Sequence, residues 1–136
     1  MSSMVIGLAS GSLEKLVVAS TLTGGAVALD MDVDIYLLLG GAYAFRKDVA
    51  DSNTYSDRPE LLEEMTASMV GNAVPAPLDS LRKLREDGAV RIHACGTAGL
   101  IWGAGELGDF VNLVDDIAGI AEYIVHWEEA DVVQVL

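Results

Sequence analysis

Short apolar runs alternate with helix-forming stretches along this chain, and this alternation constrains its fold more than any other feature. Residues 4–10 (MVIGLAS) are an apolar run that ends at Gly11 and Ser12, as is typical of a buried strand. Residues 32–41 (DVDIYLLLGG) are a second such run, and residues 13–28 between the two carry an apolar stripe. This spacing predicts two parallel strands joined by a helix in a right-handed crossover.

The rest of the chain continues the alternation. The expected elements are a loop over residues 46–57, helices over 60–70 and 78–87, strands over 89–94 and 110–113, a helix over 114–130 and a last strand over 131–136. In the helix over 114–130 we expect these residues to face inward: Ile117, Ile120, Ala121, Ile124 and Trp127. The pattern predicts one α/β domain over residues 1–136, with three layers and a mainly parallel sheet of about five strands.

The chain is strongly acidic. Eight Lys and Arg residues stand against 21 Asp and Glu residues, which gives a formal net charge of −13. Such a charge repels nucleic acid and anionic membrane surfaces, so we expect neither as a partner. Two interpretations of the acidity remain open: an ordinary solvated surface, or adaptation to a high-salt cytoplasm in which salt screens the repulsion.

The amino-terminal residues and the cysteine count bear on localisation. Residues 1–10 lack the basic region of a secretory signal. The longest charge-free apolar stretches, residues 16–29 and 35–45, are shorter than the roughly 18–20 residues of a membrane span. A single cysteine excludes an internal disulfide and suits a reducing compartment. We therefore expect a soluble, cytoplasmic protein with no membrane partner.

Most sequence patterns that bind cofactors or metals are missing. Residues 7–12 (GLASGS) lie where a phosphate-binding loop would, but they match neither common nucleotide-binding pattern. His93 and Cys95 alternate on a strand and point to the same side, so a shared metal site is geometrically allowed. A hydrogen-bonded core or interface histidine is the simpler interpretation of His93, and His126 suits the last turn of its helix. We expect no cofactor and no metal.

Residues 61–69 carry a stripe of Leu and Met residues with helical spacing. Such a stripe usually belongs to the core. Here it follows a long polar loop and precedes Pro75 and Pro77, which also suits a helix that packs on a partner subunit or covers a pocket. Both interpretations remain open.

Cys95 is the candidate nucleophile. It follows an apolar strand, and ligands and reactive groups gather beyond the carboxyl ends of strands in open parallel sheets. Amide groups of Gly96 and Thr97, if they point at the sulfur, favour the thiolate, and Trp102 is placed to shield one side. The alternative is an inert buried thiol, because free cysteines are among the most buried residues.

Three segments together resemble the DsrE/DsrF-like sulfur-relay family, some members of which are described as peroxiredoxin-like. Residues 10–43 are similar to the family's first loop, first helix and second strand. Residues 90–103 (VRIHACGTAGLIWG) place a single cysteine after an apolar strand, as the family does, and residues 114–136 are similar to its last helix and strand. The resemblance covers most of the chain.

The resemblance implies a Rossmann-like subunit that forms homo-oligomers and carries sulfur on Cys95. The family's cysteine accepts sulfane sulfur or a thiosulfonate and passes it to a small sulfur-carrier protein or a low-molecular-weight thiol. Cys95 is the position that matches the family's functional residue, whereas His93 and the GTAGLIWG run after the cysteine depart from its usual pattern. The residues expected to line a substrate site around the cysteine are Ser10, Gly11, His93, Gly96, Thr97 and Trp102.

Overall fold

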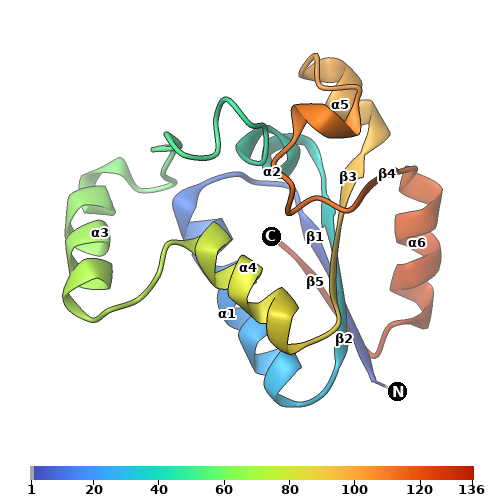
Figure 1. Cartoon of the computed structure of the whole chain (residues 1–136), viewed down its shortest axis with the longest axis horizontal. Helices are drawn as coiled ribbons and strands as arrows, with labels where there is room; N and C mark the ends of the chain where they lie inside the picture. The colour runs from blue at the N-terminus through green and yellow to red at the C-terminus, as the bar shows by residue number, and fades with distance from the viewer. Residues whose placement is uncertain (1) are drawn as a thin grey trace.

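In the computed structural model, which describes residues 2–136, five strands form a single sheet (Figure 1). The strands are β1 (Ser3–Leu8), β2 (Asp32–Leu37), β3 (Val90–Cys95), β4 (Asp116–Ala118) and β5 (Val132–Val135). Their order is β4-β3-β2-β1-β5, and every neighbouring pair is parallel. The predicted three-layer α/β fold with a parallel sheet is confirmed.

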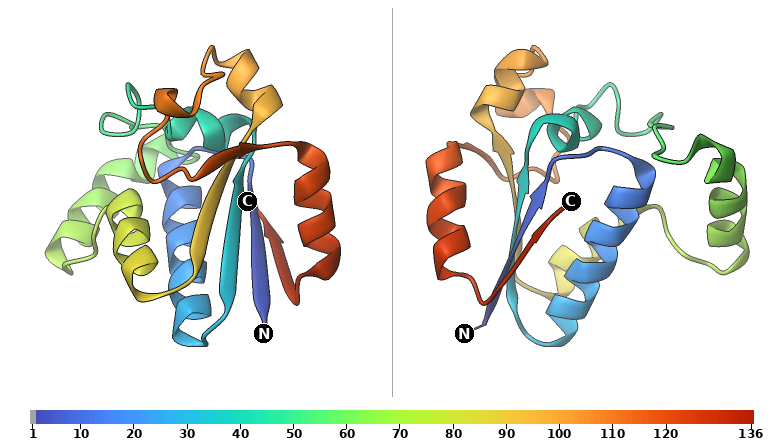
Figure 2. Two further views of the ribbon diagram at one scale, coloured as in Figure 1. Left: turned by 45° about the vertical axis from the view of Figure 1, so that its right-hand side comes forward. Right: turned by 180° about the vertical axis from the view of Figure 1, so that it is seen from behind.

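Helices cover both faces of the sheet and its carboxyl edge. They are α1 (Leu13–Ala28), α2 (Leu39–Ala44), α3 (Leu62–Gly71), α4 (Pro77–Asp87), α5 (Gly96–Ile101) and α6 (Ile120–Glu129), with 3-10 turns η1 (Pro59–Leu61) and η2 (Leu107–Asp109). Helices α1 and α4 lie on one face, α6 lies on the other, and α2 and α5 lie beyond the carboxyl ends of the strands (Figure 2). No helix among the described residues is long and apolar enough to cross a membrane.

The main core lies between the sheet and the α1–α4 layer. Alternate strand residues such as Ile6, Ile35 and Ile92 are fully buried there, and Leu16 of α1 and Leu81 of α4 pack into the same cluster. Because side chains of a strand alternate between faces, the intervening residues of β2 and β3 point toward α6. That second face carries the polar side chains of these strands.

Helix α1 begins where the sequence predicts. Ser12 is its N-cap, with an extended backbone and a side-chain oxygen that accepts the N–H of Lys15 at 3.2 Å. The Ser12 hydroxyl also donates to a carboxylate oxygen of Asp57 at 2.8 Å, which ties the helix start to the loop over residues 46–57. The cap therefore fixes both the entry of the helix and the path of this loop.

The second strand is shorter than expected. It ends at Leu37, and helix α2 takes the residues of the Gly-Gly exit instead. A Cβ atom on Gly41 would lie 2.1 Å from the carbonyl oxygen of Leu8, and one on Gly11 would lie 2.3 Å from the carbonyl oxygen of Gly40. These glycines let α2 pack directly on the end of β1, which explains why the strand stops there.

The carboxyl-terminal helix was expected in the wrong place. Residues 116–118 form the edge strand β4, and α6 begins only at Ile120. The inward face of α6 is formed by Tyr123, whereas Ile120, Ile124 and Trp127 are about half exposed, at 50%, 46% and 46%. The Tyr123 ring fills the space above Gly7, because a Cβ atom on Gly7 would lie 2.2 Å from the Tyr123 hydroxyl oxygen. This space explains why an aromatic side chain, and not an aliphatic one, points inward from α6.

The expected strand over residues 110–113 is also wrong. The described structure has a single antiparallel bridge there, between Arg46 and Phe110. Phe110 and Leu113 are nevertheless buried in the main core. This segment is therefore apolar because its side chains pack into the core from a loop, and not because it pairs as a strand.

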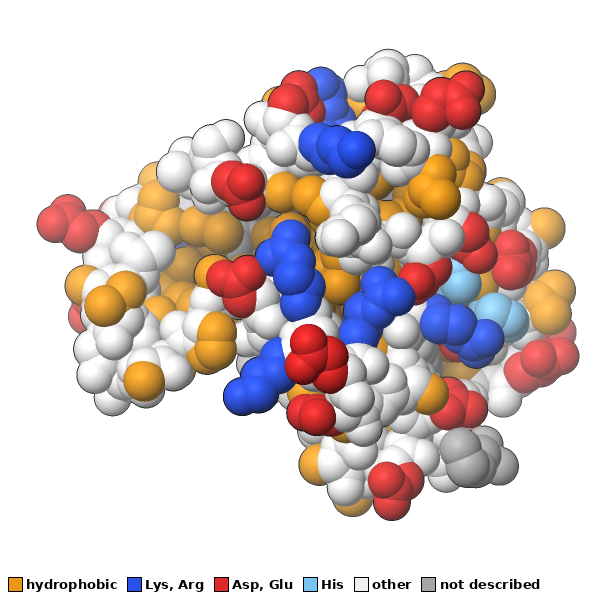
Figure 3. Space-filling view, in the orientation of Figure 1, with side chains coloured by type: hydrophobic (Ala, Val, Ile, Leu, Met, Phe, Trp, Pro, Cys, Tyr) orange, Lys and Arg blue, Asp and Glu red, His pale blue; other side chains and the backbone are white. Residues whose placement is uncertain are grey.

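Helix α3 stands apart from the rest of the chain, beyond α1 (Figure 2). No side chain of α3 is buried, so the core interpretation of the Leu and Met stripe at residues 61–69 is wrong. Hydrophobic side chains line the hollow between α3, which we call the arm, and the rest of the chain (Figure 3). The interpretation that remains is a helix that faces a partner or covers a pocket.

The close contact at Gly41 generates the first prediction. We expect Gly41→Ala to lower the free energy of unfolding by about 2 kcal/mol, because the new methyl group overlaps the backbone of β1. The matched control is Gly25→Ala, which adds a methyl group to an exposed helical position with no atom within 4 Å. The control should gain roughly 0.5–1 kcal/mol in urea unfolding. Equal stability of the two variants would contradict this role of Gly41.

Candidate functional site

Cys95 lies where the carboxyl ends of the parallel strands meet, which we call the carboxyl edge of the sheet. It is the last residue of β3 and the N-cap of α5, and its side chain is partly exposed. Across the sheet it pairs with Ala118 of β4. The thiol is therefore held at a fixed point on a strand end, where open parallel sheets place ligands and reactive groups.

Gly96 and Thr97 form the first turn of the helix that follows the cysteine. Within the described residues, the Cys95 side chain makes no capping hydrogen bond to the amide groups of this turn. Strand β4 lies close by, because a Cβ atom on Gly96 would be 3.7 Å from Cγ2 of Ile117 and 3.9 Å from the carbonyl oxygen of Ala118. A side chain at position 96 would thus meet β4 at ordinary van der Waals distance.

Trp102 connects the two helices at this edge. Its indole Nε1–H donates to the carbonyl oxygen of Leu39 at 2.7 Å, and its ring packs on Tyr43 with 4.8 Å between centroids. The guanidinium of Arg46 donates to the Trp102 carbonyl oxygen at 3.1 Å and lies over the Tyr43 ring. Trp102 therefore braces the end of α5 against α2, with its polar N–H already engaged.

Ser10 and Gly11 lie at the end of β1, where the loop is already internally bonded. The N–H groups of Ala9 and Ser10 both donate to the carbonyl oxygen of Leu136, at 2.7 and 3.2 Å. The Ser10 hydroxyl accepts the N–H of Ser12 at 3.2 Å, and Gly11 packs against the backbone of α2. These donors are used by the chain itself, so in this conformation they do not form an open anion-binding loop.

His93 lies on the α6 face of the sheet and is only 4% exposed. Its Nε2 atom is 2.7 Å from Oδ1 of Asp34, and its Nδ1 atom is 2.7 Å from Oδ1 of Asp116. Both ring nitrogens are thus occupied by carboxylates of the two neighbouring strands. The residues described contain no group of three side chains able to hold a metal, so the geometry matches a hydrogen-bonded histidine.

The charges in this cluster support one another. Burial lowers the pKa of His93, but its hydrogen bonds to Asp34 and Asp116 outweigh burial and raise that pKa above its usual value. Burial likewise opposes ionisation of Asp34, yet the hydrogen bond from His93 and the positive charge of Arg91, 3.2 Å away, lower the pKa of this carboxyl. Both directions favour an imidazolium held between two carboxylates, which we call the His93 clamp.

An aromatic layer separates the clamp from α6. The Tyr36 ring stacks on the His93 ring at 4.5 Å, and its hydroxyl is hydrogen-bonded to Nδ1 of His126 at 2.5 Å. Burial, reinforced by the charge of Glu122, raises the pKa of Tyr36 far above its usual value, so this phenol stays neutral. The Tyr123 hydroxyl is buried and has no hydrogen-bond partner among the described residues.

The structure joins only some of the predicted site residues. Cys95, Gly96 and Thr97 lie together at the end of β3. Ser10 and Gly11 lie two strands away along the same edge of the sheet, since β2 separates β1 from β3. His93 belongs to the clamp beneath α6.

Sequence reasoning missed the partners of His93. Asp34 and Tyr36 interrupt the apolar strand β2 at alternate positions, and Arg91 and His93 do the same on β3. Polar residues at a spacing of two on neighbouring strands share one face of the sheet. This double alternation was the available signal, whereas the position of Asp116 in a strand was not visible.

Two solved structures share this fold over essentially the whole chain. The ychN protein from E. coli is 17% identical, with a TM-score of 0.61 and 100% coverage of both chains. Protein MTH1491 from Methanobacterium thermoautotrophicum, a protein of unknown function, is 13% identical, with a TM-score of 0.60 and coverage of 98% of this chain and 99% of its own. The sequence matches no protein-family model and no curated protein. The chain is thus an α/β protein with a Rossmann-like three-layer fold of the ychN kind.

The clamp predicts a stability that depends on pH. We expect His93→Asn to lower the free energy of unfolding by about 3 kcal/mol near pH 6, because it leaves two carboxylates without their shared cation. The pKa of His93 is raised on folding, so this advantage of the wild type is complete below the unfolded value and is lost as pH rises through the folded value.

Urea unfolding from pH 5.5 to 9.5 measures this difference. The control is Asp79→Asn, which removes a surface ion pair with Arg82 and should change stability by less than about 0.5 kcal/mol at every pH. A gap between wild type and His93→Asn that widens with rising pH would contradict the assignment.

Proposed function

We propose that this protein is a sulfur carrier that holds sulfane sulfur or a thiosulfonate on Cys95 and passes it to a partner thiol. The observation that carries the proposal is the place of Cys95, a partly exposed thiol at the end of β3 and at the N-cap of α5. The resemblance of residues 10–43, 90–103 and 114–136 to the DsrE/DsrF-like sulfur-relay family supports it. The fold shared with the ychN protein is compatible with this family.

The loading step needs no external oxidant. When the Cys95 thiolate attacks the outer sulfur of a persulfide R–S–SH, a Cys95–S–SH bond forms, the donor S–S bond breaks and R–S⁻ leaves. When it attacks an inner sulfur of tetrathionate, Cys95 gains the S–SO₃⁻ group and thiosulfate leaves. In both cases one S–S bond replaces another, so electrons balance.

Delivery requires a second molecule. The chain has one cysteine, so no internal thiol can take over the sulfur. An incoming thiolate from a small sulfur-carrier protein or a low-molecular-weight thiol attacks the outer sulfur, and the Cys95 thiolate leaves. Exposed apolar side chains at the carboxyl edge of the sheet are suited to contact such a partner or a neighbouring subunit. They are Leu39, Leu100, Ile101 and Leu107, which are 49%, 77%, 61% and 43% exposed.

In this proposal the residues near Cys95 shape the surroundings of the thiol. Gly96 and Thr97 form the first turn of α5, directly after the thiol. Trp102 fixes the end of α5 through its bond to Leu39. Ser10 and Gly11 border the same edge of the sheet and stay candidates for contact with a larger donor.

Intact-mass spectrometry tests the proposal. Wild-type protein treated with tetrathionate or polysulfide should gain a single adduct, a reducing thiol should remove it, and Cys95→Ser should gain none. The control is reaction of the same wild-type sample with iodoacetamide, which shows that the thiol is accessible. A thiol that reacts with iodoacetamide but takes up no sulfur would contradict the sulfur-carrier function.

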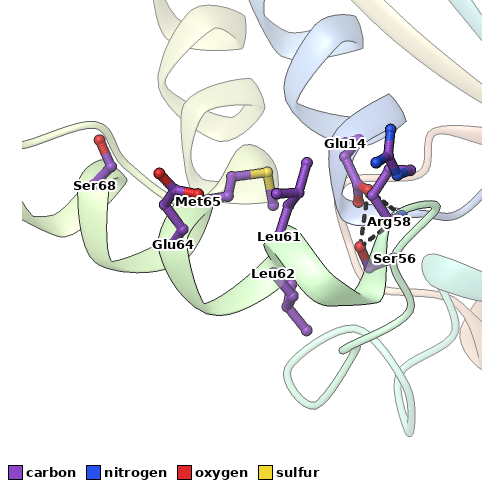
Figure 4. A pocket seen from close by; sticks show the side chains of 8 residues that line it. All are labelled: Glu14, Ser56, Arg58, Leu61, Leu62, Glu64, Met65 and Ser68. Atoms are coloured by element: carbon purple, nitrogen blue, oxygen red, sulfur yellow. Dashed lines mark hydrogen bonds between the residues drawn. The ribbon is translucent and has the colours of Figure 1, made fainter.

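The exposed arm favours a second candidate, a non-catalytic module that assembles with itself or binds a small ligand. Between α1 and α3 lies a pocket of about 350 Å³ whose lining includes Leu61 and Met65 (Figure 4). At one end of the pocket Oε2 of Glu14 accepts the Ser56 hydroxyl at 2.8 Å, and Figure 4 shows this bond. An arm without buried side chains needs a partner to stabilise its short helix. This candidate predicts that Cys95→Ser changes stability alone.

A further inference from the structure

Strand β4 runs beside β3 from the His93 clamp to the cysteine. It has three residues and forms the edge of the sheet, where Asp116 pairs with His93 and Ala118 pairs with Cys95. Its next residues lead directly into α6.

Just before β4, Asp115 exchanges hydrogen bonds with the backbone of Ile92 and pairs with Arg85. Three residues of parallel pairing add little to this anchor, so the side-chain bond from Asp116 to His93 is the main further attachment of the strand itself.

The two carboxylates of the clamp differ in their access to water. The Asp34 side chain is 8% exposed and also pairs with Arg91, whereas the Asp116 side chain is 53% exposed. A neutral imidazole has a single N–H and can donate to only one of them. It keeps Asp34, because a buried carboxylate without its donor is far more costly than one that turns into water. Loss of the proton therefore breaks the bond to Asp116.

We propose that the proton on His93 is a latch that fastens β4, and α6 after it, beside the thiol end of β3, and that its loss loosens this segment and makes the partly exposed Cys95 more accessible. The step is a proton transfer from the imidazolium to water or hydroxide, with no other bond made or broken. The regulatory meaning of the latch rests on the proposed sulfur-carrier function, because it would control access to the carrier thiol.

Every ionisable group packed around His93 contributes to its pKa. From β2 these are Asp34 and Tyr36, from β3 Arg91, from β4 Asp116, and from α6 Glu122, Tyr123 and His126. The carboxylates favour the protonated ring, while burial and Arg91 oppose it, and the net direction is a raised pKa of His93. The latch is therefore closed below that raised pKa and opens as pH rises through it.

Hydrogen exchange measured by mass spectrometry tests the latch on peptides that cover residues 114–130. After correction for the intrinsic effect of pH, wild-type protection in this segment should fall, by up to about tenfold per pH unit, as pH rises from the ordinary histidine pKa of about 6.5 through the raised pKa of His93, and should then level off. Peptides from α1 should not change. Protection of residues 114–130 that stays constant from pH 6 to 10 would overturn the proposal.

Two variants give opposite expectations. His93→Gln lacks the second charged donor and should show low, pH-independent protection of residues 114–130. Asp116→Asn presents an amide that can accept from or donate to Nδ1 of a neutral ring, so its protection should stay high at alkaline pH. If His93→Gln does not fold, the wild-type pH series and Asp116→Asn decide alone. Asp116→Asn that opens with pH as the wild type does would overturn the latch.

The rate of Cys95 alkylation by iodoacetamide links the latch to the thiol. The ratio of the His93→Gln rate to the wild-type rate, taken at each pH, removes the ordinary effect of thiol ionisation. This ratio should exceed about five near pH 6.5 and approach one at high pH, as expected for a segment that is mostly closed. A ratio of one at every pH would overturn control of the thiol. No sulfur donor is used, so failure of sulfur loading and failure of the latch are separate results.

Discussion

One buried imidazolium joins three strands of the sheet. His93 of β3 binds Asp34 of β2 and Asp116 of β4, each at 2.7 Å, with little contact to solvent. A charge in such a place is stable only while both partners and all hydrogen bonds are present. The clamp positions β4 together with the strand pairing and the bonds of Asp115, and Ala118 of β4 lies beside Cys95.

The two faces of the sheet are consequently different in character. The α1–α4 face closes a predominantly apolar core, which stabilises the domain through burial of aliphatic side chains. The α6 face has a small apolar cluster, to which Val5, Tyr36 and Tyr123 belong, next to the clamp. Helix α6 therefore turns its tyrosine and His126 inward and leaves Ile120, Ile124 and Trp127 partly exposed. Together with the arm α3, these side chains give the monomer two surfaces suited to contact with other molecules.

Local rules predict much of this fold, and contacts between distant segments explain what they miss. The strand–helix–strand spacing, the Ser12 cap and the helix end before Gly88 depend on neighbouring residues and are visible in the sequence. The start of α2 and the strand β4 depend on packing against β1 and β3, which periodicity does not show. At the candidate site, Cys95 could be identified by its place after a strand, while the partners of His93 required the register between three strands.

Nuclear magnetic resonance of the His93 ring tests the central claim most directly. In protein labelled with ¹³C and ¹⁵N histidine, with His126→Gln as the assignment control, both His93 nitrogens should carry protons at pH 6. The ring should titrate above the ordinary histidine value of about 6.5, because its carboxylate partners raise the pKa of His93. A His93 ring that is neutral at pH 6, or that titrates below about 6.5, would contradict the clamp and everything inferred from it.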